Sequence, residues 1–231
     1  MTSAVFVTGC AGFIGFHLTR LLLQQGTPVC GIDNFDPFYS RELKEKNIRD
    51  LKAWSAQVGA SFQFIEKDIN NLSVDDFAST EFSAIIHLAA KAGVRPSLER
   101  PMDYIKVNVD GTASLLEFAR QRGIKNFVFG SSSSVYGDDS PRPFKEDALA
   151  AKPVSPYAAS KRAGELLCYT YHSAFKLNFA VLRFFTVYGP RQRPDLAIRK
   201  FSEHILKDKE IVLFGDGTTS RDYTFVEDIA K

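Results

Sequence analysis

VTGCAGFIG, residues 7–15, is the stretch that decides the fold, because its three glycines stand between an expected strand and an expected helix. The apolar, β-branched run at residues 4–9 indicates the strand, and apolar side chains at helical spacing over residues 12–26 indicate the helix. Gly9, Gly12 and Gly15 would let the backbone turn tightly and approach a pyrophosphate. The first turn of the helix would offer this group free N–H donors and a positive dipole end. The spacing therefore predicts a phosphate-binding turn.

The rest of the chain alternates between strand-like and helix-like segments. Further strands are expected at residues 28–33, 60–68, 83–90, 126–134 and 178–189, with helical segments between them. This alternation predicts an α/β fold of the Rossmann type, a doubly wound parallel sheet with helices on both faces. We expect this domain to span residues 1–189 and residues 190–231 to begin a smaller substrate-binding lobe. Because the chain stops inside an expected helix, VEDIAK, we expect that lobe to be incomplete.

Composition excludes several classes of function. The 231 residues carry a net charge of +2 with no basic run, so neither nucleic acid nor an anionic membrane is expected as a partner. No apolar segment approaches the roughly 20 residues that span a bilayer, and the N-terminus does not resemble a signal peptide. Three scattered cysteines predict buried thiols in a reducing, cytoplasmic location, and the four histidines show no metal-ligand spacing.

An acidic residue at the end of the second expected strand points to the dinucleotide. Asp33 follows the glycine turn by about twenty residues, where a carboxylate can accept hydrogen bonds from both ribose hydroxyls and repel a 2′-phosphate. The position favours NAD over NADP, although Asp33 could also be a loop residue or a helix cap. Asp68, followed by Ile69, ends the third expected strand and could bond the adenine amino group.

A second candidate site lies in SPYAASKRAGE, residues 155–165. Tyr157 and Lys161 are four residues apart in an expected helix, so they share one face. Such a pair can be an ordinary surface contact. Beside the serines at 131–134, however, Lys161 and a nicotinamide cation could lower the Tyr157 pKa by about three units, which needs roughly 4 kcal/mol. Tyr157 could then remove a hydroxyl proton while the attached carbon gives hydride to NAD⁺.

With both candidate sites taken together, the chain resembles the extended short-chain dehydrogenase/reductase family. The resemblance is to its NAD-dependent nucleotide-sugar epimerase/dehydratase branch, and within it most to UDP-glucuronate 4-epimerases. The segments that carry it are TGCAGFIG, IDNF, KDI, HLAAKAGVRPS, NVDGT, SSSSVYGD, SPYAASK, RFFTVYGPRQRPD and GDGTTSRDYTFVEDIA. The resemblance implies a Rossmann fold, bound NAD, a UDP-sugar substrate and a homodimer packed through helices, one of which carries Tyr157.

The resemblance also implies roles for individual residues. The pyrophosphate would contact Gly9, Gly12, Phe13, Ile14 and Gly15, the adenosine ribose would contact Asp33 and Asn34, and Asp68 and Ile69 would flank the adenine. The rest of the cofactor would be lined or supported by Leu88, Ala89, Ala90, Lys91, Asn108, Tyr157, Lys161 and Phe185. Ser132, Tyr157 and Lys161 would be catalytic, and the substrate would contact Ser132, Ser133, Thr186, Arg193 and Arg221.

Two serines bear on the reaction type. In the 4,6-dehydratases of this branch, an Asp-Glu pair follows the catalytic threonine, whereas here Ser133 and Ser134 follow Ser132. A hydroxyl pair cannot readily eliminate water, so epimerisation at C4 through a 4-keto sugar is the simpler reaction. UDP-glucose epimerase, UDP-glucuronate decarboxylase, dehydratase and a non-catalytic NAD sensor remain alternatives.

One segment departs from the pattern of UDP-glucuronate 4-epimerases. GPRQRPD, residues 189–195, stands where that group usually has Trp-Gly before the RPD. Arg193 could pair with a 6-carboxylate, or it could be a surface residue of the loop. Because family members continue for roughly another hundred residues, we expect these 231 residues alone to bind NAD with weak or absent turnover.

Overall fold

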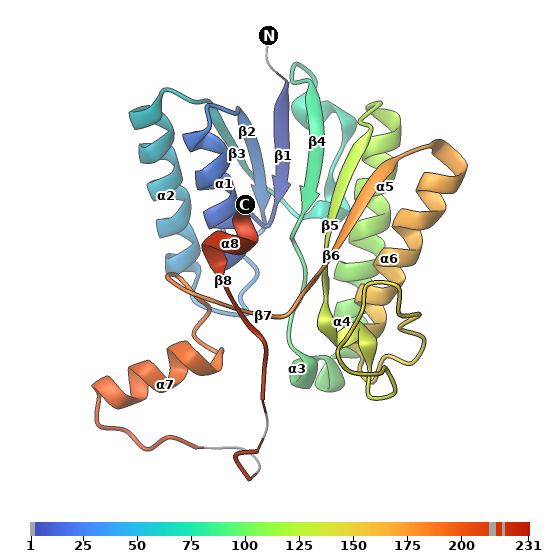
Figure 1. Ribbon diagram of the computed structural model, residues 1–231. Coiled ribbons are helices and arrows are strands. Elements are labelled where there is room, and N and C mark those ends of the chain that lie inside the picture. Colours follow the sequence, from blue (N-terminus) through green and yellow to red (C-terminus); the bar gives the residue numbers. More distant parts are fainter. Residues whose placement is uncertain (1–2, 213–215, 219) are drawn as a thin grey trace.

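Six parallel strands form the central sheet of the computed structural model, which describes residues 3–212, 216–218 and 220–231 (Figure 1). Their order across the sheet is β3-β2-β1-β4-β5-β6. Their bounds are β1 Ala4–Thr8, β2 Val29–Asp33, β3 Phe62–Glu66, β4 Phe82–His87, β5 Asn126–Ser132 and β6 Asn178–Phe184. The predicted doubly wound parallel sheet is confirmed.

Helices cover both faces of this sheet, with α1, α2 and α8 on one side of the view in Figure 1 and α5 and α6 on the other. The α-helices are α1 Phe13–Gln24, α2 Arg41–Val58, α3 Val94–Glu99, α4 Pro101–Tyr104, α5 Gly111–Gln121, α6 Pro156–Phe175, α7 Ala197–Leu206 and α8 Val226–Ala230. A π-helical segment, Ile105–Asp110, joins α4 to α5, and 3₁₀ turns span Ile69–Asn71, Val74–Phe77 and Ser133–Tyr136.

The apolar run of β1 is explained by burial on both faces. Successive side chains of a strand point to opposite faces. Val5 and Val7 accordingly pack in the core beneath α1 and α2, whereas Phe6 packs in the core beneath α5 and α6. A strand between two helical layers needs apolar residues at every position.

The order of the strands places a topological switch point beside β1. β1 pairs with β2 on one side and with β4 on the other, so the chain crosses over β1 between β3 and β4. In open parallel sheets, ligands bind beyond the carboxyl ends of the strands at this point. The loops after β1, β2, β4 and β5 therefore define where a site is expected.

The strand expected at residues 178–189 is wrong as a single element. It divides at Phe185 into β6 and a short strand, β7 Thr186–Tyr188, which pairs in parallel with β8 Tyr223–Phe225 in a separate two-stranded sheet. The division has a physical reason: the last residue of β5, Ser132, lies opposite Phe184, so no partner strand continues beyond that point. The run EIVLFG, residues 210–215, also predicts a strand, but none is formed at 210–212, and residues 213–215 lie outside the described residues.

The β7–β8 pair crosses the boundary expected at residue 189, and α8 then packs on α1. Val187 and Val226 form a small apolar cluster there with Phe13. The division into domains stays a prediction. Across the described ranges, none of the helices is long and apolar enough to cross a membrane.

Candidate active site

The glycine turn at the end of β1 is built so that side chains cannot occupy it. Gly9 has φ +73°, and a Cβ on Gly15 would lie 2.1 Å from the Gly9 carbonyl oxygen. The Gly12 N–H donates to that same oxygen at 3.0 Å. Within the described residues, no side chain caps the first turn of α1 and no acidic residue lies in it. The turn therefore offers N–H groups and a positive dipole end to an anion.

Asp33 lies at the end of β2 with its carboxylate beside this turn. One oxygen accepts a hydrogen bond from the Ala11 N–H at 3.2 Å, and the other accepts one from the Phe35 N–H at 2.9 Å. Burial raises the pKa of Asp33, while the bonds from Phe35 and Ala11 and the nearby Lys44 oppose that rise. Each oxygen keeps a lone pair for a further donor, as a ribose diol requires. The residues present therefore fit the adenosine half of NAD.

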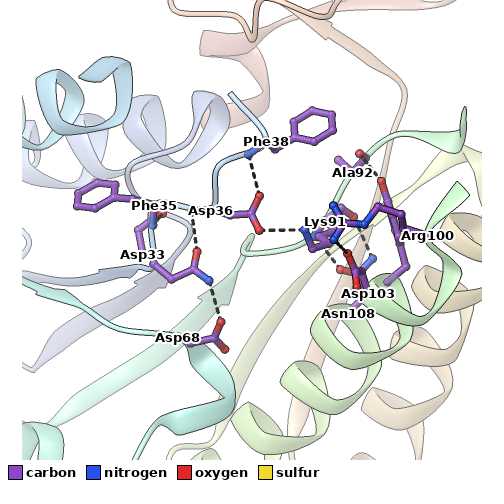
Figure 2. A network of polar contacts seen from close by, with 12 residues as sticks. Asp33, Phe35, Asp36, Phe38, Asp68, Lys91, Ala92, Arg100, Asp103 and Asn108 are labelled. Carbon is purple, nitrogen blue, oxygen red and sulfur yellow. Dashed lines mark hydrogen bonds and ion pairs between the residues drawn. The ribbon is translucent and has the colours of Figure 1, made fainter. Parts of the chain in front are cut away.

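Two further predicted residues meet beside Asp33. The Asn34 amide donates to Asp68 at 2.7 Å (Figure 2). The second carboxylate oxygen of Asp68 accepts the Asn70 N–H at 2.9 Å. Burial raises the Asp68 pKa, but these hydrogen bonds outweigh it and the pKa is lowered. Ile69 is buried in the 3₁₀ turn that Asp68 caps. The structure thus brings the expected ribose and adenine residues to one edge of the sheet.

Lys91 belongs to a polar network that joins the loops after β2 and β4. Its ammonium lies 3.0 Å from the Asp36 carboxylate, and its backbone N–H and carbonyl both bond the Asn108 side chain, at 2.8 and 3.0 Å (Figure 2). Asn108 stands in the π-helical segment and also donates to Ser160 on α6 at 2.9 Å. Asp36 was not singled out from the sequence, because its partner lies 55 residues away. Its only local signal was the second acid in IDNFD.

Leu88 and Ala89 are placed by a buried hydroxyl. Their N–H groups donate to Thr8 Oγ1 at 3.2 and 3.1 Å, and Thr8 is in turn bonded to His87 Nδ1 at 2.8 Å. Ala89 also lies against the glycine turn, because a Cβ on Gly9 would be 2.8 Å from its nitrogen. His87 was not assigned a role from the sequence.

Tyr157 and Lys161 face inward from the first turns of α6. Ser155 caps this helix by accepting the Ala158 N–H at 3.1 Å. The Lys161 ammonium, 5% exposed, donates to the Gly130 carbonyl at 2.8 Å and lies over the Phe129 ring. Burial lowers the Lys161 pKa to about 8, although Glu165 opposes this.

The groups that influence the Tyr157 pKa differ from the expectation that Lys161 lowers it. Burial raises the pKa of the phenol, and the two influences that oppose this rise are a hydrogen bond with Ser132 and the charge of Arg193. The Lys161 ammonium is bonded to the Gly130 carbonyl rather than to the phenol. Arg193, and not Lys161, is thus the protein cation that lowers the Tyr157 pKa.

The serines after β5 form a compact hydroxyl cluster. Ser132 Oγ lies 2.7 Å from Ser134 Oγ and accepts the Ser134 N–H at 3.2 Å, and Ser133 belongs to the same 3₁₀ turn. Phe185 lies close to Tyr136 and Phe144, where β6 ends, and Thr186 begins β7.

The two arginines expected on the substrate side differ in position. Arg193 is held by a two-point ion pair with Asp195, at 2.7 and 3.0 Å, and lies over the Phe38 ring. Its charge is close enough to influence Tyr157. Arg221 is exposed and donates to the Ser220 carbonyl, so the structure does not bring it to the other candidates.

Comparison with known proteins gives one consistent result. The family model "NAD dependent epimerase/dehydratase family" matches residues 5–231. A UDP-glucuronate 4-epimerase of Thermodesulfobacterium geofontis is 45% identical over 227 residues, covering 97% of this chain and 68% of that protein.

Comparison with solved structures agrees with this result. The UDP-glucuronic acid 4-epimerase from Bacillus cereus, in complex with UDP-glucuronic acid and NAD, superposes with a TM-score of 0.89 at 40% identity, covering 98% of this chain and 70% of that one. The UDP-glucose 4-epimerase of Thermotoga maritima, with UDP-glucose, superposes at 0.85 and 31% identity, covering 98% and 71%. With its glycine turn, the Asp33 carboxylate and the Tyr157–Lys161 helix at one sheet edge, the chain belongs to the NAD-dependent epimerase/dehydratase family.

Proposed function

We propose that this protein epimerises a UDP-sugar at C4 through a 4-keto intermediate, with UDP-glucuronate as its substrate. The observation that carries the proposal is the position of Tyr157 in the first turn of α6, after the carboxyl end of β5, where Ser132 and Arg193 both act to lower the pKa of its phenol. Its neighbours at 133 and 134 are serines, so the acid and base that a dehydration needs are missing at those positions.

Tyr157 is the base in the proposed cycle. The Ser132 hydroxyl bonds the C4 oxygen and Tyr157 together, so the proton of the C4 hydroxyl has a short path to the phenolate oxygen. Arg193 stabilises that phenolate against the effect of burial. Lys161, in its protonated form, would hold the nicotinamide ribose, and because the Lys161 pKa is about 8, this contact is present below pH 8 and fades above it.

The cofactor completes the cycle. NAD, held by the glycine turn, Asp33 and the loop carrying Lys91, supplies a hydride acceptor and donor at C4 when bound. The remaining steps belong to the chain: Ser132 holds the keto oxygen, and Tyr157 returns the proton once the sugar has presented its other face. The same tyrosine thus takes and returns the proton for both configurations at C4 of the sugar.

Arg193 supports the choice of a uronate. It already binds a carboxylate at two points, that of Asp195, which is the geometry a guanidinium uses for a sugar carboxylate. The similar proteins named above include UDP-glucuronate 4-epimerases, which agrees with this choice. A substrate carboxylate would take the place of Asp195 on Arg193.

The test is a product assay on UDP-glucuronate and UDP-glucose with NAD present, read by chromatography over an incubation long enough to detect the weak turnover expected of these 231 residues alone. We expect UDP-galacturonate from UDP-glucuronate, and Tyr157→Phe to slow its formation at least about 100-fold while NAD still binds. Tyr169→Phe, an exposed tyrosine on the same helix, is the control and should change nothing. A UDP-pentose product would indicate decarboxylation instead, and unchanged activity of Tyr157→Phe would exclude the proposed base.

A further inference from the structure

A buried ionic cluster lies behind the Tyr157–Lys161 face, centred on Glu165. This carboxylate is 5% exposed and accepts hydrogen bonds from Ser131 Oγ at 2.5 Å and from Arg162 at 2.7 Å. Arg183 donates two more, one to each carboxylate oxygen, both at 3.0 Å. None of these contacts was expected from the sequence.

The position of Glu165 connects three elements of the candidate site. It stands four residues after Lys161 and eight after Tyr157, so all three lie on one face of α6. Ser131 directly precedes Ser132 on β5, and Arg183 lies opposite Ser131 on β6. One carboxylate therefore holds α6, β5 and β6 together at the place where the candidate catalytic groups emerge.

The contact between α6 and β5 is also sterically tight. A Cβ on Gly164, next to Glu165, would lie 2.4 Å from the Phe129 ring, so only glycine allows the helix to come this close. At this distance, a small shift of α6 along β5 changes the distance between Tyr157 and Ser132. The cluster opposes that shift, because Glu165 bonds α6 to both β5 and β6.

Stability alone does not account for such a cluster. Burial would raise the pKa of Glu165, but the bonds from Arg183, Ser131 and Arg162 outweigh it and the pKa is lowered. Buried ion pairs can often be replaced by apolar residues of equal volume with no loss of stability. What an apolar replacement could not reproduce is the directional bond to Ser131 and a negative charge beside Lys161.

We propose that Glu165 is a positioning residue of the active site, which fixes the Ser131–Ser132 end of β5 against the Tyr157–Lys161 face of α6. The proposal rests on the function proposed above for Ser132, Tyr157 and Lys161. Its evidence, however, is the contact geometry of the protein itself.

The same carboxylate influences the charge of Lys161. Burial lowers the Lys161 pKa to about 8, and Glu165 acts against this. Among the described residues, the other titratable or charged groups that interact with Lys161 or Glu165 are His87 of β4, Arg162 and Cys168 of α6 and Arg183 of β6. His87 is neutral at physiological pH, because its pKa is about 3. Removing the Glu165 charge should therefore let Lys161 lose its proton at lower pH.

The deciding measurement is the dissociation constant of NAD between pH 6 and 9.5, obtained by calorimetry on the full chain. We expect affinity to fall as Lys161 loses its proton near pH 8, and Glu165→Gln to move this fall about 1 pH unit lower. Glu117→Gln is the matched control: it removes an exposed glutamate that is paired with Arg120, and the profile should remain that of the parent protein. A parent profile with no fall near pH 8, or a Glu165→Gln profile equal to it, would overturn the proposal.

Ser131→Ala distinguishes the positioning of β5 against α6 from the effect of the Glu165 charge on Lys161. It also serves as the test if Glu165→Gln does not fold. It removes the bond to β5 but keeps the carboxylate, so the fall in NAD affinity should stay near pH 8. The kcat of epimerisation should drop about tenfold with little change in KM, and an unchanged kcat in Ser131→Ala would count against positioning. If the parent protein binds NAD but converts no UDP-sugar, the proposed function fails while the NAD profile still decides the role of Glu165.

Discussion

At the scale of single residues, His87 shows how buried polar groups fix a protonation state. The Thr112 hydroxyl donates to the Asn108 carbonyl at 2.6 Å, so its oxygen accepts from His87 Nε2 at 3.0 Å. His87 Nδ1 is then the acceptor of the Thr8 hydroxyl, whose oxygen takes the N–H groups of Leu88 and Ala89. The chain of bonds requires a neutral imidazole, in agreement with a pKa lowered to about 3, mainly by burial and then by Lys161.

This histidine should make the protein sensitive to acid. The unfolded chain binds its proton near pH 6.5 and the folded chain near pH 3, so the contribution of His87 to stability is full above pH 6.5 and is lost as pH falls toward 3. By linkage the loss is on the order of 5 kcal/mol at most. We expect His87→Gln to be less stable than the parent protein at pH 8, but to lack the loss of unfolding free energy that His87 causes as pH falls. Urea unfolding between pH 4 and 8 measures both. His204→Gln changes a half-buried histidine of α7 and should retain the acid-dependent loss. Parallel pH profiles for His87→Gln and the parent protein would contradict the argument.

At the scale of elements, regular periodicity was the reliable signal in the sequence. The helix over residues 12–26 was predicted because its apolar side chains repeat with the helical period, and it is found as α1. The strand expected over 178–189 failed because alternation of side chains says nothing about which strand is the partner. Its division at Phe185 depends on where β5 ends, more than 50 residues earlier in the chain.

The loop after β7 is a second element that the sequence did not reveal. Arg191, with φ +66°, donates to Asn47 and Asp50 of α2, both at 2.6 Å, and its guanidinium lies over the Phe16 ring. Asn47 in turn donates to the Ala11 carbonyl in the glycine turn at 2.8 Å. This chain of bonds ties the segment that carries Arg193 to the phosphate-binding turn.

We expect Arg191→Ala to release that loop. The lost bonds are partly exposed and screened, so unfolding should be easier by about 1–2 kcal/mol, with Tm lower by about 2–8 °C. The KM for UDP-glucuronate should rise more than kcat falls, because Arg193 is two residues away. Lys46→Ala removes the other, exposed partner of Asp50 and should lower Tm by no more than a degree or so. Equal effects of the two substitutions would show that Arg191 does not anchor the loop.

At the scale of the whole molecule, strand order explains which candidates could be located from the sequence. Asp33, Asp68, Lys91 and Ser132 each follow the end of a parallel strand or lie at it, so the fold alone brings them to one edge. Arg221 lies before β8, outside the main sheet, and is not brought there. The partners that hold the site, such as Asp36 for Lys91 and Arg183 for Glu165, come from distant segments, and nothing in the local sequence pairs them with these residues.

The surface of α6 that faces away from the sheet bears on the homodimer implied by the resemblance. Ala158 is fully buried within the chain, but Ala159, Ala163, Leu166 and Tyr169 follow helical spacing on the outer face, with Leu166 52% and Tyr169 63% exposed. The neighbouring α3 and α4 add the exposed side chains of Leu98 and Met102. We infer that a second copy of the chain covers this apolar face.

Sedimentation velocity at micromolar concentration tests this inference. We expect the mass of two chains for the parent protein and of one chain for Leu166→Glu. In a two-fold contact, this substitution places two unpaired carboxylates, one from each copy, in an apolar interface, and their burial is strongly unfavourable. Leu206→Glu changes a still more exposed leucine, 84% exposed on α7, and should leave the dimer intact. A parent protein that sediments as one chain would contradict the dimer. A dimer broken by Leu206→Glu and not by Leu166→Glu would place the contact away from α6.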